Sequence, residues 1–186
     1  MRAFPVSDNV GLVIKTVYGE HHSSEYIKLL EIALVDRRIH VINSVLPRDE
    51  MYGLIAACDC YVSLHRAEGF GLGLAEAMLL GKPVIGTAYS GNLDFMHPGN
   101  SCLVKHTMTP VPRDAYPFRM GQEWAEPDID HAAEYMSRLV NDDVYRDEIA
   151  KAGQAYIRKE HSFSAVGLKI QDRINAIEKM LDGNHE

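Results

Sequence analysis

Short apolar runs alternate with amphipathic stretches along the first hundred residues of the chain. The continuous apolar or β-branched runs predict five buried strands, at residues 10–15, 39–45, 61–64, 83–86 and 101–104. The helices predicted between them begin at Ser23 or Ser24, at Pro47 and near Gly71. Strands that alternate with helices are typical of a parallel sheet that is buried on both sides. The pattern therefore predicts an α/β fold with helices on both faces of a parallel sheet.

Regular patterning stops between residues 105 and 127. Pro110, Pro112 and Pro117 interrupt this segment, which also contains Tyr116, Phe118, Arg119 and Trp124. The segment is too rich in aromatic residues for a flexible linker, and its length is unusual for a connection in a compact domain. We therefore predict an ordered loop with a functional surface. A helix is predicted to start within Trp124–Asp128, with Pro127 in its first turn.

The end of the chain, over about residues 128–182, has a helical pattern. Apolar residues recur there at helical spacing and form two faces: Ala132, Met136, Leu139 and Val140, then Val166, Ile170, Ile174, Ile177 and Leu181. Aliphatic stripes of this kind usually belong to a core, so both faces are predicted to be buried. A length of 186 residues suits one domain, and we predict a single domain over residues 1–186.

Composition and charge exclude several classes of function. The net charge is −7 and Lys and Arg are not clustered, so nucleic acid is not expected as a partner. No apolar run approaches the ~20 residues of a transmembrane segment. The three cysteines, Cys58, Cys60 and Cys102, form no C-x-x-C motif and fit a cytoplasmic protein. His21 and His22 have no further ligands at a suitable spacing, so no metal site is expected.

The most distinctive stretch runs from Glu68 to Glu76 and reads EGFGLGLAE. It follows the third predicted strand and leads into the helix near Gly71, so it lies at the edge of the sheet where α/β folds bind ligands. A helix N-terminus preceded by glycines favours a phosphate group. Two carboxylates beside it would repel a bare anion. They are better suited to accept hydrogen bonds from hydroxyl groups on the two sides of a diphosphate, such as those of a sugar and a ribose.

Two other interpretations of this stretch remain open. A dinucleotide-binding fingerprint, G-x-G-x-x-G/A, is disfavoured because Leu74 or Glu76 occupies its third glycine position and because two strand–helix units come first. Alternatively, the glycines serve only the packing of a tight strand–helix junction.

Three segments together carry a resemblance to a known family. They are Glu68–Met78 (EGFGLGLAEAM), Gly81–Gly86 (GKPVIG) and Ser90–Asn92 (SGN). In this combination they resemble the E-x7-E signature region of retaining GT-B glycosyltransferases, and most of all the branch called glycosyltransferase group 1 or family 4. The resemblance is close over residues 52–104 and extends in pattern to residues 10–45 and to the helical end. It implies one half of a GT-B fold, the C-terminal Rossmann-like domain that binds the donor.

The resemblance also implies roles for individual residues. Glu68 would contact the hydroxyls of the donor sugar, Glu76 would hold the ribose hydroxyls, and Lys15 would contact the diphosphate. Glu68 and Lys15 are then the expected catalytic residues. The other expected donor-binding residues lie in a turn, a base-contacting loop and a sugar pocket: Gly69, Phe70, Gly71 and Leu72; Ser44, Val45 and Leu46; Ser90, Gly91 and Asn92. The resemblance implies a nucleotide-diphosphate sugar as substrate, with neither a metal nor a further cofactor.

The sequence departs from the family pattern at two positions. Many members carry a lysine–glycine pair soon after the first strand, where this chain has Gly19 and Glu20. A serine is common three residues before the first glutamate, where this chain has His65. The next residue, Arg66, is either an additional positive charge for the site or a solvated turn residue.

The short segment before the first strand leaves no room for an acceptor-binding domain. The resemblance therefore implies a donor-binding half that is inactive without its N-terminal acceptor domain. The alternative is a Rossmann-like interaction or nucleotide-binding domain without catalytic activity. The sequence does not favour one base, sugar, acceptor or oligomeric state over another.

Overall fold

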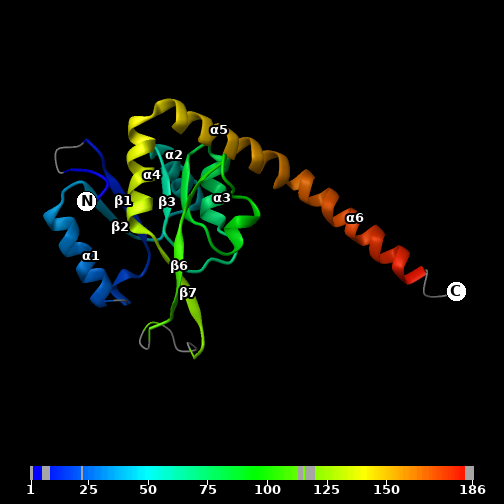
Figure 1. Cartoon of the computed structure of the whole chain (residues 1–186), viewed down its shortest axis with the longest axis horizontal. Coiled ribbons are helices and arrows are strands. Elements are labelled where there is room, and N and C mark those ends of the chain that lie inside the picture. The colour runs from blue at the N-terminus through cyan, green and yellow to red at the C-terminus, as the bar shows by residue number, and fades with distance from the viewer. Residues whose placement is uncertain (1, 6–8, 22, 113–114, 116–119, 183–186) are drawn as a thin grey trace. The chain divides into compact units, whose positions relative to one another are not determined.

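The computed structural model describes residues 2–5, 9–21, 23–112, 115 and 120–182 (Figure 1). The chain divides into two compact units, residues 1–54 and residues 55–186. The single nucleotide-sugar-binding domain over residues 1–186 stays a prediction.

The first unit is built on two parallel strands that are joined by a helix. Its elements are β1 (Leu12–Thr16), the 3-10 helix η1 (Gly19–His21), α1 (Ser23–Val35) and β2 (Ile39–Asn43). Strands β1 and β2 pair in parallel, with Leu12 opposite Ile39. Helix α2 (Arg48–Ala57) follows and contains the boundary between the units. The strands and helices predicted for this part of the chain are confirmed.

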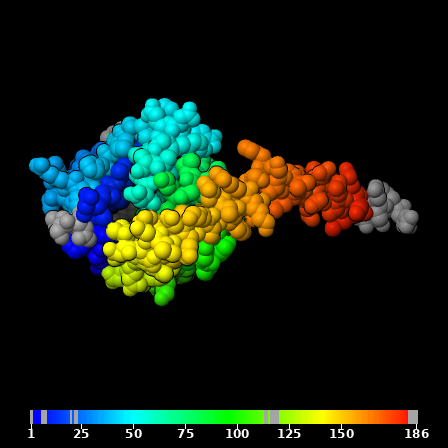
Figure 2. Space-filling model, turned by 90° about the horizontal axis from the view of Figure 1, so that it is seen from above, coloured from blue at the N-terminus to red at the C-terminus, as the bar shows by residue number. Residues whose placement is uncertain are grey.

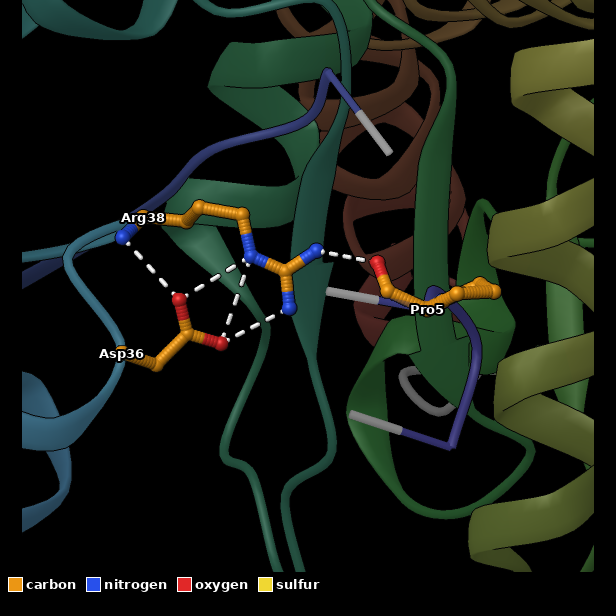
Figure 3. A network of polar contacts seen from close by, with 3 residues as sticks. All are labelled: Pro5, Asp36 and Arg38. Atoms are coloured by element: carbon orange, nitrogen blue, oxygen red, sulfur yellow. Dashed lines mark hydrogen bonds and ion pairs between the residues drawn. The ribbon is translucent and has the colours of Figure 1, made fainter. Parts of the chain in front are cut away.

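An ion pair fixes the turn between α1 and β2 in this unit (Figure 3). The Asp36 carboxylate accepts a hydrogen bond from Nη2 of Arg38 at 2.7 Å and another from the backbone N–H of Arg38 at 3.1 Å. Nη1 of Arg38 donates to the carbonyl of Pro5 at 2.6 Å. The hydrogen bonds from Arg38 lower the pKa of Asp36 to about 2, so the carboxylate is ionised at neutral pH.

The second unit contains a three-stranded parallel sheet in the order β3-β4-β5. Its strands are β3 (Tyr61–Ser63), β4 (Val84–Thr87) and β5 (Cys102–Val104), and the first helix of the unit after α2 is α3 (Leu72–Leu79). Strand β4 is buried along its whole length, as a strand covered on both faces should be. The predicted α/β fold with parallel sheets is confirmed.

Helices cover both faces of this three-stranded sheet. Neighbouring residues of a strand point to opposite faces. Ile85 of β4 packs in a buried cluster with Ala132 and Leu139 of α4 (Ile129–Asn141). The next residue, Gly86, faces Leu74 of α3, whose side chain lies 3.4 Å from the position that a Cβ on Gly86 would take. Helices α3 and α4 therefore lie on opposite faces, and α3 begins at the edge where β3 ends.

The prediction of an ordered loop between residues 105 and 127 is wrong. Strands β6 (His106–Pro110) and β7 (Glu123–Pro127) form an antiparallel hairpin, seen in Figure 1 as a two-stranded ribbon that projects from the second unit. Pro110 and Pro127 lie at strand ends, where a missing N–H is tolerated. The predicted surface residues Tyr116, Phe118 and Arg119 lie outside the described residues.

Helix α4 begins later than predicted, because Trp124 and Pro127 belong to β7. Asp128 is its N-cap, and its carboxylate accepts hydrogen bonds from the backbone N–H groups of Asp130 and His131, each at 3.0 Å. These bonds lower the pKa of Asp128, the one from His131 most. The predicted core face of this helix is confirmed at Ala132 and Leu139, whereas Val140 is exposed.

Two further helices complete the second unit, α5 (Asp143–Glu160) and α6 (Phe163–Asp182). Figures 1 and 2 show α6 continuing from the end of α5 and projecting away from the sheet. The apolar stripe that was predicted to be core is exposed instead: Val166, Ile170, Ile174, Ile177 and Leu181 keep 40–60% of their surface accessible. The spacing of the apolar residues predicts the helix and its apolar face correctly. It does not show whether another element packs on that face. In the described ranges, no helix is both long and apolar enough to cross a membrane.

Candidate functional site

The glycines of the predicted site differ in what requires them. Gly71 is the N-cap of α3 with φ of 90°, and a Cβ there would lie 2.9 Å from a methyl carbon of Leu74. A Cβ on Gly73 would lie 2.6 Å from the hydroxyl oxygen of Tyr61. Nothing lies within 4 Å of a Cβ on Gly69. Packing therefore explains Gly71 and Gly73, as the alternative interpretation holds, but it does not explain Gly69.

The Glu68 carboxylate lies on the turn that precedes α3. Its Oε1 accepts hydrogen bonds from the backbone N–H groups of Gly69 at 3.0 Å and Gly71 at 3.2 Å. These amides, which the resemblance places against the donor, are thus oriented to hold an anionic oxygen at the positive end of a helix. Phe70, between them, is partly exposed and packs on Phe95 with 5.1 Å between ring centroids. Leu72, the first residue of α3, is exposed.

The loop after β4 lies directly against Glu68. The hydroxyl of Ser90 donates to the Glu68 carbonyl at 2.5 Å, and the Gly91 N–H points to the same oxygen at 3.4 Å. A Cβ on Gly91 would lie 1.8 Å from the carbonyl oxygen of Gly69, so only glycine fits. Asn92 is fully buried, and its Nδ2 donates to the carbonyl of Thr87 at 3.0 Å. The structure therefore brings Ser90 and Gly91 to the turn and places the Asn92 side chain beneath it.

Glu76 lies in the second turn of α3 and is half-buried. Burial raises the pKa of Tyr61, and the negative charges of Glu68 and Glu76 raise it further. The Tyr61 hydroxyl, which packs on Gly73, therefore stays protonated at neutral pH. Sequence reasoning missed Tyr61. The signal in the sequence was Gly73, a glycine inside the first turn of a helix. Glycine is unfavourable there unless a neighbouring side chain occupies the space of a Cβ.

Arg66 attaches the β6–β7 hairpin to the segment that leads to Glu68. Its guanidinium bonds both carboxylate oxygens of Glu126, at 2.5 and 2.8 Å, and lies 4.8 Å from the centre of the Trp124 ring. The carbonyl of Arg66 accepts from the N–H of Ala125 at 3.0 Å. The pairing raises the pKa of Arg66 and lowers that of Glu126. Arg66 is thus paired with a carboxylate, which neither interpretation from the sequence anticipated.

Four predicted site residues lie in the first unit. Nζ of Lys15, near the end of β1, donates to the carbonyl of Thr16 at 2.9 Å and to that of Ser44 at 2.5 Å. Lys15 and the loop predicted to contact the base, Ser44–Leu46, are therefore brought together; Ser44 and Val45 are exposed and Leu46 is half-buried.

The departure at Gly19 has a local explanation. Its N–H donates to Oδ1 of Asn43 at 3.0 Å, and a Cβ would lie 2.6 Å from the Tyr26 ring. Across the part of the chain that the structure describes, no group of three or more His, Cys, Asp or Glu side chains is placed to hold a metal ion.

The sequence matches the family of glycosyl transferases group 1 over residues 3–110. The match covers more than half of the chain and contains Glu68, Glu76 and the turn between them. The chain therefore belongs to the glycosyl transferases group 1 family, and the predicted resemblance is confirmed.

Individual relatives agree with this assignment. A sucrose synthase of Melioribacter roseus is 32% identical over 97 residues, which are 48% of this chain and 12% of that protein. The fold is similar to that of Anabaena Alr3699/HepE in complex with UDP and glucose, with a TM-score of 0.67 and 20% identity over 94% of this chain and 42% of that one. It is also similar to the C-terminal domain of the group 1 protein LpcC from Francisella tularensis, with a TM-score of 0.56 and 22% identity over 77% of this chain and 64% of that one. The chain thus spans less than half the length of the first two proteins.

Proposed function

We propose that this chain is the donor-binding part of a retaining glycosyltransferase that moves a sugar from a nucleotide-diphosphate sugar to an acceptor. The observation that carries the proposal is the arrangement at the start of α3. There the Glu68 carboxylate, the amides of the glycine turn and the Ser90–Gly91 loop meet, and Glu76 follows one turn later on the same helix. Fold similarity alone would not support a function, but this arrangement contains the groups that a donor requires.

The chemistry of the turn suits an activated sugar. The amides of Gly69 and Gly71 already hold an anionic carboxylate oxygen, and a diphosphate presents oxygens of the same kind. Negative charge develops on the diphosphate as the glycosidic bond breaks, and fixed donors such as these amides stabilise it. The sugar carbon becomes cation-like, and the Glu68 carboxylate is suited to stabilise that charge. Glu76 accepts hydrogen bonds from the ribose in this proposal.

The proposal also covers the donor, the acceptor-binding domain and the cellular compartment. HepE, which has a similar fold, has been solved with UDP-glucose, so a UDP-sugar is the first donor to test. We infer that transfer requires a separate acceptor-binding domain, because the chain spans only 42% of HepE and because α6 exposes an apolar stripe. We also infer a cytoplasmic setting, which the free thiols of Cys58, Cys60 and Cys102 support.

Calorimetric titration of the chain with UDP-glucose, GDP-mannose and ADP-glucose tests the function. We expect one of these donors to bind, and Glu76→Ala to abolish its binding because the ribose loses its acceptor. Glu148→Ala is the matched control, because Glu148 is an exposed glutamate on α5, and this variant should bind as the wild type does. Silence towards all three donors would support the non-catalytic interaction domain instead. Robust sugar transfer by the isolated chain would refute the need for an acceptor domain.

A further inference from the structure

One histidine links the end of β3 to the loop that lies against the glycine turn. The ring of His65, which follows β3, is half-buried. Its Nδ1 lies 3.2 Å from the hydroxyl of Ser63, and its Nε2 lies 3.2 Å from the carbonyl of Tyr89 and 3.1 Å from Oδ1 of Asn92. The ring therefore joins the end of β3 to both ends of the loop Tyr89–Asn92, which lies against Glu68.

The partners of the ring determine which of its nitrogens donates a hydrogen bond. The carbonyl of Tyr89 can only accept a hydrogen bond. The amide of Asn92 has a fixed orientation, because its Nδ2 donates to the carbonyl of Thr87 at 3.0 Å and its Oδ1 is left to accept. Both partners of Nε2 are thus acceptors, so Nε2 carries the proton. In the neutral ring Nδ1 then accepts from the hydroxyl of Ser63.

The loop held by His65 is strained where it meets the turn. Ser90 has φ of 78°, a left-handed conformation that a non-glycine residue rarely adopts. Such a conformation persists only where the surroundings enforce it. The strained residue is the one whose hydroxyl donates to the Glu68 carbonyl, and the next residue, Gly91, is in contact with Gly69. Hydrogen bonds at the two ends of the loop, from one ring, hold it in this conformation.

We propose that His65 is a positioning residue for the sugar end of the donor site: its Nε2–H holds Tyr89–Asn92 in place, and this loop in turn sets the position of Glu68. The inference rests on the proposed function, in which Glu68 contacts the sugar. Glu76 lies in the second turn of α3, so its position follows from that of the helix. Loss of the Nε2 donor should therefore weaken recognition of the sugar and leave recognition of the nucleotide nearly unchanged.

Two amide substitutions separate positioning from simple packing. In His65→Gln the side-chain amide nitrogen reaches about as far from the backbone as Nε2 does, so the donor to Tyr89 and Asn92 is retained. In His65→Asn the amide nitrogen reaches only as far as Nδ1, so that donor is lost. His131→Asn is the matched control, because His131 is a half-buried histidine on α4 whose Nδ1 accepts from the N–H of Lys105, a role that the Asn oxygen can take.

The experiment is a calorimetric titration of the full chain and these variants with UDP-glucose and with UDP. We expect His65→Asn to weaken UDP-glucose binding about tenfold and UDP binding less than about threefold. His65→Gln and His131→Asn should stay close to the wild type. Equal weakening of both ligands in His65→Asn, equal loss in His65→Gln, or no change in either variant would overturn the proposal.

A second measurement needs no variant and no ligand. A two-bond proton–nitrogen NMR correlation of the histidine rings should show a proton on Nε2 of His65, and a proton on Nδ1 alone would overturn the proposal. Different results would refute the proposed function and the role of His65. If the wild type binds none of UDP-glucose, GDP-mannose and ADP-glucose, the proposed function and the role of His65 fall together. If the wild type binds and the variants do not differ, only the role of His65 is refuted.

Discussion

The close contact between Gly73 and Tyr61 leads to a prediction about the stability of a Gly73→Ala variant. Gly73 has no positive φ, so its backbone would accept alanine, and alanine is favoured over glycine in a helix by about 1 kcal/mol. A Cβ at this position would, however, lie 2.6 Å from the Tyr61 hydroxyl, where ordinary contacts begin at 3.4 Å. Tyr61, the first residue of β3, is half-buried and packs on α3, so its hydroxyl cannot move aside freely. Gly73→Ala should therefore destabilise the chain by about 1–2 kcal/mol net, as overpacking does.

Removal of the hydroxyl should reverse the sign of this effect. In Tyr61→Phe the nearest ring atom would be Cζ, 3.3 Å from the added Cβ, which is close to an ordinary contact. Adding Gly73→Ala to this background should be neutral or stabilising by up to about 1 kcal/mol. The coupling energy between the two positions should thus be about 1–3 kcal/mol.

Urea unfolding of the wild type, both single variants and the double variant measures this coupling. Parallel titration with UDP-glucose shows whether the displaced phenol also disturbs Glu68 and Glu76. The reasoning is refuted if Gly73→Ala is as stable as the wild type, or if the two substitutions are additive.

Two other predictions concern the loop and the turn between α1 and β2. Gly91→Ala would place a Cβ 1.8 Å from the backbone oxygen of Gly69. We therefore expect the free energy of unfolding, measured in urea, to fall by about 3 kcal/mol or more, and UDP-glucose binding to be lost. Gly167→Ala on α6 is the control and should not destabilise the chain, because nothing lies within 4 Å of a Cβ there. Because Arg38 lowers the pKa of Asp36 from 3.8 to about 2, the stability that this pair contributes is present above pH 4 and is lost as the pH falls towards 2. Asp36→Asn should therefore be less stable than the wild type at neutral pH, and the difference should shrink between pH 4 and 2; a difference that is constant over this range would contradict the assignment.

Much of the fold could be predicted because its signals are local. Buried parallel strands appear as continuous apolar runs, and the run at β4, between the helix stop at Gly81 and the loop at Ser90, is a clear example. The glycine turn was found for the same reason, since its residues are neighbours in sequence. The hairpin was missed because its ladder joins His106 to Pro127, and no local pattern reports a pairing across so long a connection.

The missed residues of the site depend on proximity in space. Tyr61 and Gly73 meet only when α3 packs on β3, and Arg66 meets Glu126 only when the hairpin has formed. His65 was noted as a departure from the family, but its three partners come from β3 and from the loop after β4. The exposed stripe of α6 shows the converse: the pattern marks an apolar face, and only the structure shows that the face is uncovered within the described residues.

The pairing of Arg66 with Glu126 also has a consequence for the order of folding. The two residues are 60 positions apart, and closing a flexible loop of that length carries an entropy term of about 3.6 kcal/mol before any contact compensates for it. The sheet and the helices between these residues shorten that loop once they have formed, so we expect the ladder of β6 and β7 to attach late. The segment that leads into Glu68 would then reach its final conformation only in the last steps, after the rest of the second unit is in place.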